Sequence, residues 1–305
     1  MKVLLASSSE VSIGVLSYLL SEKKIDLKCV VTNPDKATGR GQALLQNKVS
    51  KWCEDKKVIV KKVENNSQFI EVVKDFKIDL IITVAYGHIL KEELLHLPKY
   101  GCINLHYSLL PKYRGAAPVQ WAILNGEQTT GVTVFQLNSG MDTGPIYLQQ
   151  ELAIRPDEVT NDLIGRLNHV GVELISQTLD LIATGAKPVP QPSEGASSAP
   201  KFGKEDGALN WNLSAIDIYN RYRAIGENPG VYTAYADNKI KISDMRILNT
   251  DSLTAGAFQL FNGELTVGTN TSDIAIEKLT PAGRKMMSGI DFINGLTTKE
   301  SLYFA

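Results

Sequence analysis

The first part of the chain alternates short apolar runs with stretches in which apolar residues recur at helical spacing. Four apolar runs have the length and composition of buried strands: 3–6, 27–32, 80–85 and 102–105. Three amphipathic stretches are predicted as helices: 67–76, 91–97 and 118–124. A further helical stripe runs from Val11 to Leu20, behind a serine cluster at 7–9 that can cap it. This alternation predicts a doubly wound, mostly parallel α/β sheet with helices on both faces.

Two strands and a long helix are predicted to complete this first domain. Residues 131–137 and 145–154 have the pattern of a hairpin-like pair of strands. Residues 160–183 form one long amphipathic stretch, which predicts a helix that closes the domain.

The composition changes after this helix. From 185 to 203, proline, serine, glycine and alanine dominate, which is typical of a linker. A short helix near 215–225 is followed by alternating apolar and polar residues with frequent turn signals, which predicts a small β-barrel. We therefore divide the chain into three parts: a first domain at 1–187, a linker at 188–203 and a second domain at 204–305.

Composition narrows the class of protein. A length of 305 residues suggests two domains, and 43% hydrophobic residues are enough to fill a core in each. The sequence has no apolar run of about 20 residues and no signal-peptide arrangement, so we expect a cytoplasmic protein without a membrane partner. Its three cysteines show no CxxC spacing, which argues against a disulfide framework and a zinc site, and no metal is expected.

Charge and short motifs exclude some functions and leave one open. Gly39-Arg40-Gly41 lacks the third glycine and the strand-to-helix position of a dinucleotide fingerprint, which argues against NAD binding. The net charge of −1 does not by itself indicate a nucleic-acid-binding protein. The segment 34–62, however, carries eight basic and three acidic residues. This segment is either a solvated surface or a contact for RNA.

Candidate catalytic side chains lie at the end of the run 102–105. In an extended strand Asn104 and His106 point to the same side, and a turn follows them directly. Loops at the carboxyl ends of strands are where open α/β sheets build their sites. Taken alone, a histidine at a strand end such as His106 is more often a structural, hydrogen-bonded residue. Taken alone, Asp142, further along the chain, is better explained as a turn residue ahead of Thr143 and Gly144.

The longer motifs decide between these interpretations. The run NLHYSLLPKYRGAAPVQ at 104–120, followed by MDTGPI at 141–146, resembles the folate-dependent formyltransferases. The runs IITVAYGHIL, LPKYGCINLH and PDKATGRGQAL are similar to the same family. The resemblance implies a Rossmann-like formyltransferase domain followed by an OB-like β-barrel that binds tRNA.

The resemblance also implies a catalytic trio of Asn104, His106 and Asp142. When an amine attacks a formyl carbon, the carbonyl oxygen becomes an oxyanion, and Asn104 and His106 would donate hydrogen bonds to it. Asp142 would favour the charged imidazole and would accept the proton that leaves the amine.

The substrates that the resemblance implies are 10-formyltetrahydrofolate as formyl donor and methionine on initiator tRNA as acceptor. The residues implied for folate are Tyr86, Gly87, His88, Ile89, Leu90, Ser108, Leu109, Leu110, Pro111, Asn138 and Gly140. Within this set His88 is equally an exposed loop histidine, and Ser108 a turn residue. The residues implied for tRNA are Arg40, Lys201, Lys204, Lys239, Lys241 and Arg246.

Three other functions remain as alternatives. A formyltransferase for an amino sugar nucleotide or a purine precursor would use the same trio, without need of the basic segment and the second domain. A hydrolase of the folate donor would use water in place of the amine. A non-catalytic RNA-binding protein would leave the trio unexplained.

Overall fold

The computed structural model describes residues 1–38, 43–296 and 302–305. Its contacts define two compact units, neither of which is continuous in sequence. Unit 1 consists of Met1–Pro118, Thr129–Ala153 and Asn161–Pro200. Unit 2 consists of Val119–Gln128, Ile154–Thr160 and Lys201–Ala305. The units differ from the contiguous division at 1–187, 188–203 and 204–305 in the two short segments that unit 2 takes from the first part of the chain.

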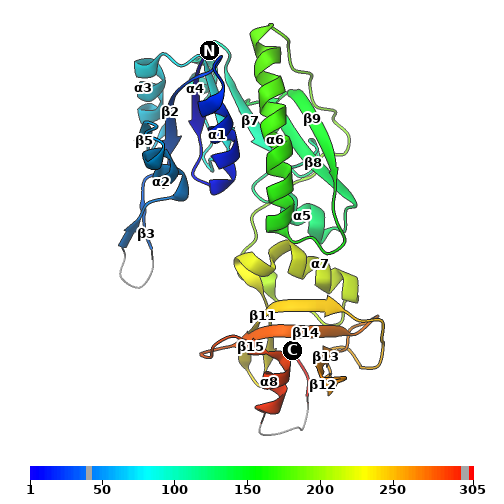
Figure 1. Cartoon of the computed structure of the whole chain (residues 1–305). Coiled ribbons are helices and arrows are strands. Elements are labelled where there is room, and N and C mark those ends of the chain that lie inside the picture. The colour runs from blue at the N-terminus through cyan, green and yellow to red at the C-terminus, as the bar shows by residue number, and fades with distance from the viewer. Residues whose placement is uncertain (39–42, 297–301) are drawn as a thin grey trace. The chain divides into compact units, whose positions relative to one another are not determined.

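A seven-stranded sheet forms the centre of unit 1, in the order β5-β2-β1-β6-β7-β8-β9 (Figure 1). The strands are β1 (Lys2–Ala6), β2 (Asp26–Thr32), β5 (Val60–Lys62), β6 (Leu80–Val84), β7 (Cys102–His106), β8 (Thr129–Gln136) and β9 (Ile146–Ala153). The strands from β5 to β7 are parallel, whereas β8 and β9 run antiparallel at one edge. The predicted α/β class and the predicted strand pair are therefore confirmed.

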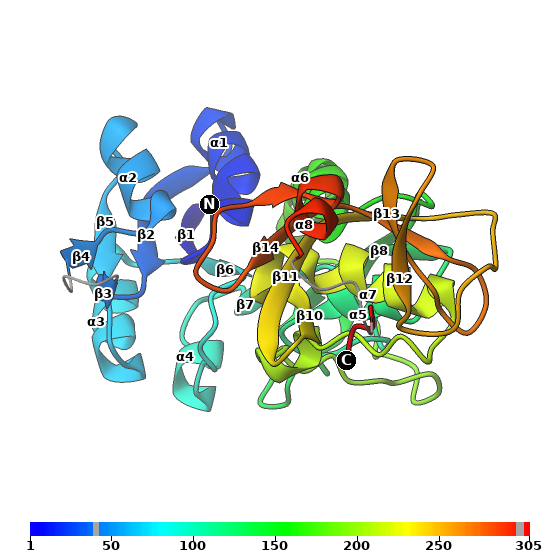
Figure 2. The same ribbon diagram turned by 90° about the horizontal axis from the view of Figure 1, so that it is seen from below.

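Helices cover both faces of this sheet. They are η1 (Glu10–Ser12), α1 (Ile13–Ser21), α2 (Lys48–Asp55), α3 (Asn66–Phe76), α4 (Glu92–His96) and α6 (Thr160–Ala183). In Figure 2, α1 and α2 lie on one side of the parallel strands and α3 and α4 on the other. The core between α3 and the sheet includes Phe69, Val73, Leu4 and Ile81, all almost fully buried. Burial of both strand faces explains the continuous apolar runs in the sequence.

Three elements of unit 1 were not predicted: α2, β5 and the hairpin of β3 (Lys36–Thr38) with β4 (Ala43–Leu45). They fall in the basic segment, where short and polar elements leave no clear apolar period. The predicted serine cap was wrong. The hydroxyl groups of Ser7 and Ser12 donate to the carbonyl of Ser9 inside the loop, and Ser9 makes no side-chain cap.

The segment predicted as a linker also differs from the expectation. Val189 exchanges backbone hydrogen bonds with Ile146 at the start of β9. Further on, the carbonyl of Ser197 accepts from the Arg114 amide, and the Ala199 amide donates to the Arg114 carbonyl. The segment up to Pro200 is therefore an extended part of unit 1. Backbone pairing of this kind needs no periodic pattern, which is why composition alone could not predict it.

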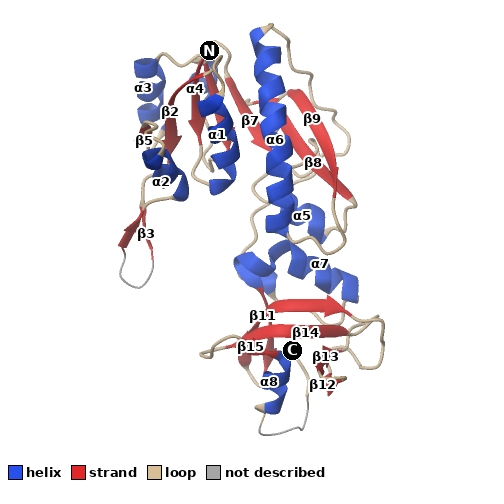
Figure 3. Ribbon diagram, viewed as in Figure 1, coloured by secondary structure: helices blue, strands red, loops and turns tan. Residues whose placement is uncertain are grey.

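Unit 2 is built around an antiparallel sheet in the order β10-β11-β14-β13-β12, with β15 paired to β14 (Figure 3). The strands are β10 (Val231–Tyr235), β11 (Asn238–Ile247), β12 (Phe258–Phe261), β13 (Glu264–Val267), β14 (Ile274–Pro281) and β15 (Met287–Ser288). The helical elements are α5 (Pro118–Leu124), η2 (Glu205–Gly207), α7 (Ala215–Ile225), η3 (Gly226–Gly230) and α8 (Gly289–Asn294). Stacked rings of Trp211, Phe258 and Phe304 form part of its core.

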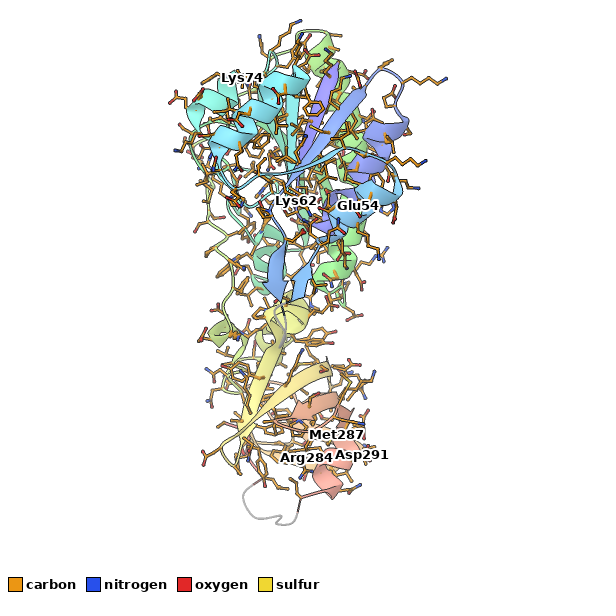
Figure 4. The ribbon with its side chains drawn as sticks, turned by 90° about the vertical axis from the view of Figure 1, so that its left-hand side faces the viewer. Glu54, Lys62, Lys74, Arg284, Met287 and Asp291 are labelled. Carbon is orange, nitrogen blue, oxygen red and sulfur yellow. The ribbon has the colours of Figure 1, made fainter. Side chains whose placement is uncertain are left out.

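The last helix of unit 2 has a side-chain cap at its start. The hydroxyl group of Ser288 accepts from the backbone amide of Asp291 and donates to its carboxylate, which satisfies an otherwise free amide of the first turn. Asp291 is labelled in Figure 4. Within the described ranges, none of the helices combines the length and the apolar character that a membrane crossing requires.

Candidate active site

The end of β7 presents Asn104 and His106 on one face of the sheet. Leu105, between them, points to the opposite face, where its side chain packs closely against Gly171 of α6. Beside Asn104 on the parallel strand β6 lies Thr83, whose hydroxyl donates to Asn104 Oδ1 at 2.7 Å. This hydrogen bond assigns the orientation of the amide, so that Nδ2 and its two protons face away from Thr83. In the part of the chain that the structure describes, no partner for Nδ2 is found.

The imidazole ring of His106 is held in place by contacts on several sides. Its side chain is buried, its ring stands edge-on to Phe135, and its Nε2 lies 2.9 Å from the backbone carbonyl of Tyr113. Because a carbonyl oxygen only accepts, Nε2 carries a proton. The second nitrogen, Nδ1, lies 3.8 Å from Asp142 Oδ2, which is an ion-pair distance and too long for a hydrogen bond.

Burial dominates the protonation of His106. It lowers the pKa of the imidazole below its ordinary value of 6.5, and the Asp142 carboxylate and the Tyr113 carbonyl oppose this effect only in part. The resting ring is therefore neutral near pH 7, with the open position on Nδ1. The carboxylate acts in the direction expected from the sequence, but it does not outweigh burial.

Asp142 occupies a tight turn between β8 and β9. Its backbone has φ +52°, a conformation that residues with a side chain rarely adopt. Gly144 must be a glycine, since a Cβ atom there would lie 1.7 Å from the carbonyl oxygen of Gln136. The carboxylate is fixed by the backbone amide of Gly115, which donates to Oδ2 at 2.7 Å. The same oxygen therefore faces both Gly115 and His106, and the three predicted catalytic residues meet at one end of the sheet.

The residues predicted for folate occupy the loops around this strand end. Tyr86 and Leu90 are buried, the Tyr86 ring contacts Phe69 and His88, and Ile89 is 69% exposed. A cavity of about 670 Å³ is lined by this loop and by the start of α3, with Tyr86, His88, Ile89 and Leu90 among its walls. Its lining does not include the predicted folate residues at 108–111 and 138–140.

The remaining folate candidates are engaged in local structure. The hydroxyl group of the fully buried Ser108 donates to the Lys112 carbonyl at 2.6 Å, as expected for a turn residue. Asn138 Oδ1 accepts from the Gly140 amide at 3.1 Å and from the Thr143 hydroxyl at 2.9 Å. These contacts shape the turn that carries Asp142. Leu110 and Pro111 are buried, and Leu109 is half-buried.

The basic residues predicted for tRNA differ in their surroundings. Arg40 lies outside the described residues, and Lys201 and Lys204 are exposed in unit 2. Lys239 Nζ sits 3.1 Å from the centre of the Tyr232 ring, and the exposed Lys241 is directly opposite Tyr232 in the register of β10 and β11. Arg246 lies between two carboxylates, those of Glu264 and Glu277. This pairing argues against a phosphate contact by Arg246.

The basic segment of unit 1 is partly neutralised. Lys62 of β5, labelled in Figure 4, pairs with Asp35 at 2.7 Å, and Lys48 at the start of α2 pairs with Glu10 at 2.5 Å. The described residues contain no group of three or more His, Cys, Asp or Glu side chains that could hold a metal ion.

Comparison with known protein families identifies the family of this chain. The family model described as formyl transferase matches residues 1–179, and the model for the formyl transferase C-terminal domain matches residues 201–297. The chain belongs to the formyl transferase family. A family member named methionyl-tRNA formyltransferase from Caldicellulosiruptor saccharolyticus is 35% identical, over 98% of both chains. Another of the same name from Thermodesulfovibrio yellowstonii is 38% identical, over 98% of this chain and 97% of the relative.

Solved structures share the fold. An N-formyltransferase from Helicobacter canadensis, in complex with folinic acid and dTDP-3-aminofucose, superposes with a TM-score of 0.68 at 20% identity, covering 90% of this chain and 98% of that one. HypX from Aquifex aeolicus, in complex with tetrahydrofolic acid, gives 0.65 at 16% identity over 96% of this chain. This chain spans about half the length of HypX, 47%.

The sequence did not point to every residue of the site. Thr83, Tyr113 and Gly115 contact the trio directly, and Gln191 binds the turn of Asp142 through its side chain. Thr83 was within reach of prediction, because it lies near the end of β6, the parallel strand next to β7. The other contacts depend on backbone geometry that no sequence pattern marks.

Proposed function

We propose that this family member transfers the formyl group of 10-formyltetrahydrofolate to the α-amino group of methionine on initiator tRNA. The choice of methionyl-tRNA as acceptor rests on one observation. Relatives named methionyl-tRNA formyltransferase match nearly the full chain, both units included, at 35% and 38% identity. The observation that carries the chemistry is the meeting of Asn104, His106 and Asp142 at one strand end.

In this proposal Asn104 binds the developing oxyanion. Attack by the amine places negative charge on the formyl oxygen, and a donor already aimed at that position stabilises the transition state without reorganisation. The amide Nδ2 meets this requirement, because Thr83 holds Oδ1 in the opposite direction at 2.7 Å.

His106 and Asp142 share the proton that the amine releases. Nε2 of His106 is bound to the Tyr113 carbonyl, so the ring can take up a proton only at Nδ1, the nitrogen 3.8 Å from Asp142. In the resting state burial keeps Nδ1 unprotonated. A proton on Nδ1 during the reaction is stabilised by the carboxylate and makes the ring a second hydrogen-bond donor for the oxyanion. When the oxyanion collapses and the bond from the formyl carbon to the folate N10 breaks, this proton passes to N10, which leaves tetrahydrofolate and returns the imidazole to its neutral form.

The substrates are assigned to different parts of the chain. The folate donor is assigned to the loops around Tyr86–Leu90 and Asn138–Gly140 of unit 1, where apolar walls and a few fixed polar atoms suit a flat ring system. The phosphates of tRNA are assigned to Lys201, Lys204, Lys239 and Lys241 of unit 2, together with Arg40.

The proposal is tested by the choice of acceptor. The purified protein is given 10-formyltetrahydrofolate with initiator methionyl-tRNA, free methionine, an amino sugar nucleotide, a purine precursor or water alone. Formylation of methionyl-tRNA should exceed that of every other acceptor by orders of magnitude in kcat/KM, and uncharged initiator tRNA serves as the control. Preferred transfer to the amino sugar nucleotide or the purine precursor, or release of formate without an acceptor, would overturn the proposal.

A further inference from the structure

Gln191 connects the extended segment after α6 to the turn that carries Asp142. Its Nε2 donates to the backbone carbonyl oxygens of Asp142 and Gly144, both at 2.8 Å. Its Oε1 accepts from the guanidinium of Arg114, at 2.6 Å from Nη2 and 3.2 Å from Nε. Both donors and both acceptor positions of the amide are in use, which fixes the side chain in one orientation.

The residues on either side of Arg114 in the chain bind the imidazole of His106 and the carboxylate of Asp142. The carbonyl of Tyr113 accepts from His106 Nε2 at 2.9 Å, and the amide of Gly115 donates to the Asp142 carboxylate at 2.7 Å. Three consecutive residues thus hold the imidazole, the side chain of Gln191 and the carboxylate. The position of Asp142 relative to His106 is set twice, through its carboxylate and through its backbone.

The backbone contact is needed because the turn is strained. A residue with a side chain persists at φ +52° only where its surroundings hold it. The two hydrogen bonds from Gln191 fix the carbonyl of Asp142 itself and that of Gly144, two residues further on. Without them the turn is free to relax, and the carboxylate moves with it.

We propose that Gln191 is a positioning residue for formyl transfer, which holds the Asp142 carboxylate in the place where it stabilises a proton on His106. This inference rests on the proposed function, since it acts through Asp142. A displacement of about 1 Å at a reacting group can cost roughly a hundredfold in rate. The contribution of Gln191 should therefore appear in kcat, while the KM values for folate and tRNA change by less than about twofold.

Two substitutions separate the two halves of the amide. Gln191→Glu keeps an acceptor for Arg114 but removes the donor and brings a negative charge to two carbonyl oxygens. Gln191→Leu removes the donor and the acceptor. Both should lower kcat by roughly ten- to a hundredfold. Gln150→Leu, at an exposed position on β9, is the matched control and should retain the wild-type kcat.

The decisive measurement repeats the substitution in an Asp142→Asn protein. Because Gln191 acts through the carboxylate, Gln191→Glu should lower kcat by less than about twofold once the carboxylate is gone. A contact that only supports the fold would lower kcat by the same factor in both backgrounds. Thermal unfolding of each variant reports whether the fold is kept, and Gln191→Glu, which keeps the pairing with Arg114, should remain folded.

Two outcomes would overturn this inference alone: wild-type kcat in both Gln191 variants, or an equal loss with and without the Asp142 carboxylate. Wild-type kcat in Asp142→Asn itself would overturn the catalytic assignment, and the inference with it. Because the first two outcomes leave Asp142→Asn impaired, the two failures are distinguishable.

Discussion

Replacing Thr83 by valine tests how the amide of Asn104 is aimed at the reacting oxygen. Thr83 is 4% exposed, and its hydroxyl donates to Asn104 Oδ1 at 2.7 Å and approaches the Ile103 carbonyl at 3.2 Å. Valine has the same branched shape without the hydroxyl. The substitution therefore removes the hydrogen bond that orients the amide and keeps the packing between β6 and β7.

The size of the effect follows from the two orientations of the amide. A hydrogen bond of this kind is worth about 1 kcal/mol net, and its loss brings the flipped amide close in energy to the native one. In the flipped state Oδ1 faces the oxyanion and repels it. Complete loss of one oxyanion donor costs roughly a hundred- to a thousandfold in kcat. Partial misorientation in Thr83→Val should cost about tenfold, or about 1.4 kcal/mol of transition-state stabilisation.

The assay is single-turnover formylation of methionyl-tRNA at saturating folate, with Thr130→Val as the matched control. Thr130 of β8 is 3% exposed, and within the described chain its hydroxyl has no hydrogen-bond partner. Its replacement should leave the rate unchanged and the melting temperature equal or higher. The reasoning is refuted if Thr83→Val keeps the wild-type rate, or if it is as harmful in an Asn104→Ala protein, which has no amide to orient.

Three further predictions concern stability, tRNA binding and thiol chemistry. Because burial lowers the pKa of His106, the unfolded chain binds a proton first as the pH falls through the ordinary value of 6.5, so folding stability should decrease below this pH. The free energy of unfolding, measured with denaturant, should decrease less between about pH 7.5 and 5.5 in His106→Gln than in the wild-type protein. An equal decrease in both proteins would contradict the lowered pKa of His106. For tRNA, replacing both Lys239 and Lys241 by alanine should reduce the slope of log affinity against log salt by about 1 to 2. Arg246→Ala should change this slope far less, because Arg246 is already paired with two carboxylates. An equal change of slope in the two variants would refute this distinction. Burial raises the pKa of the three cysteine thiols to about 11 or 12, so a thiol reagent at pH 8 should modify them only after unfolding, and rapid modification of the native protein would show that they are accessible.

Much of unit 1 could be predicted from the sequence because its strands are buried on both faces. The runs that became β1, β6 and β7 are mostly apolar and are followed by polar or glycine-containing turns, so both their existence and their approximate bounds were accessible. The elements between 34 and 62 were not, since three-residue strands and an eight-residue helix bury too few side chains to produce a period.

The proposed catalytic trio was accessible for a different reason. Alternation along a strand places Asn104 and His106 on one face, and the motif around Asp142 supplies the third member through its resemblance to formyltransferases. The residues that orient this trio are contributed by neighbouring strands and by a distant extended segment. Gln191 lies in a stretch whose composition predicts a linker, and only the fold shows that its side chain reaches Asp142.

Backbone strain distinguishes the site from the rest of the described chain. Eight residues other than glycine have positive φ there, and five have an ordinary explanation. Lys57 and Lys77 follow helices, and the remaining three lie in the two-residue hairpin turns 236–237 and 262–263, where this conformation is favoured.

The other three residues with positive φ are Ala85, Tyr113 and Asp142, and each belongs to a loop of the site. Ala85 directly follows β6, just before the loop assigned to folate, Tyr113 accepts a hydrogen bond from His106 through its carbonyl, and Asp142 carries the carboxylate. A strained residue persists only where its surroundings hold it. Hydrogen bonds of Gly115 and Gln191 hold the turn of Asp142, and β7 carries Asn104 and His106, so the sheet and these contacts together keep the geometry of the proposed site.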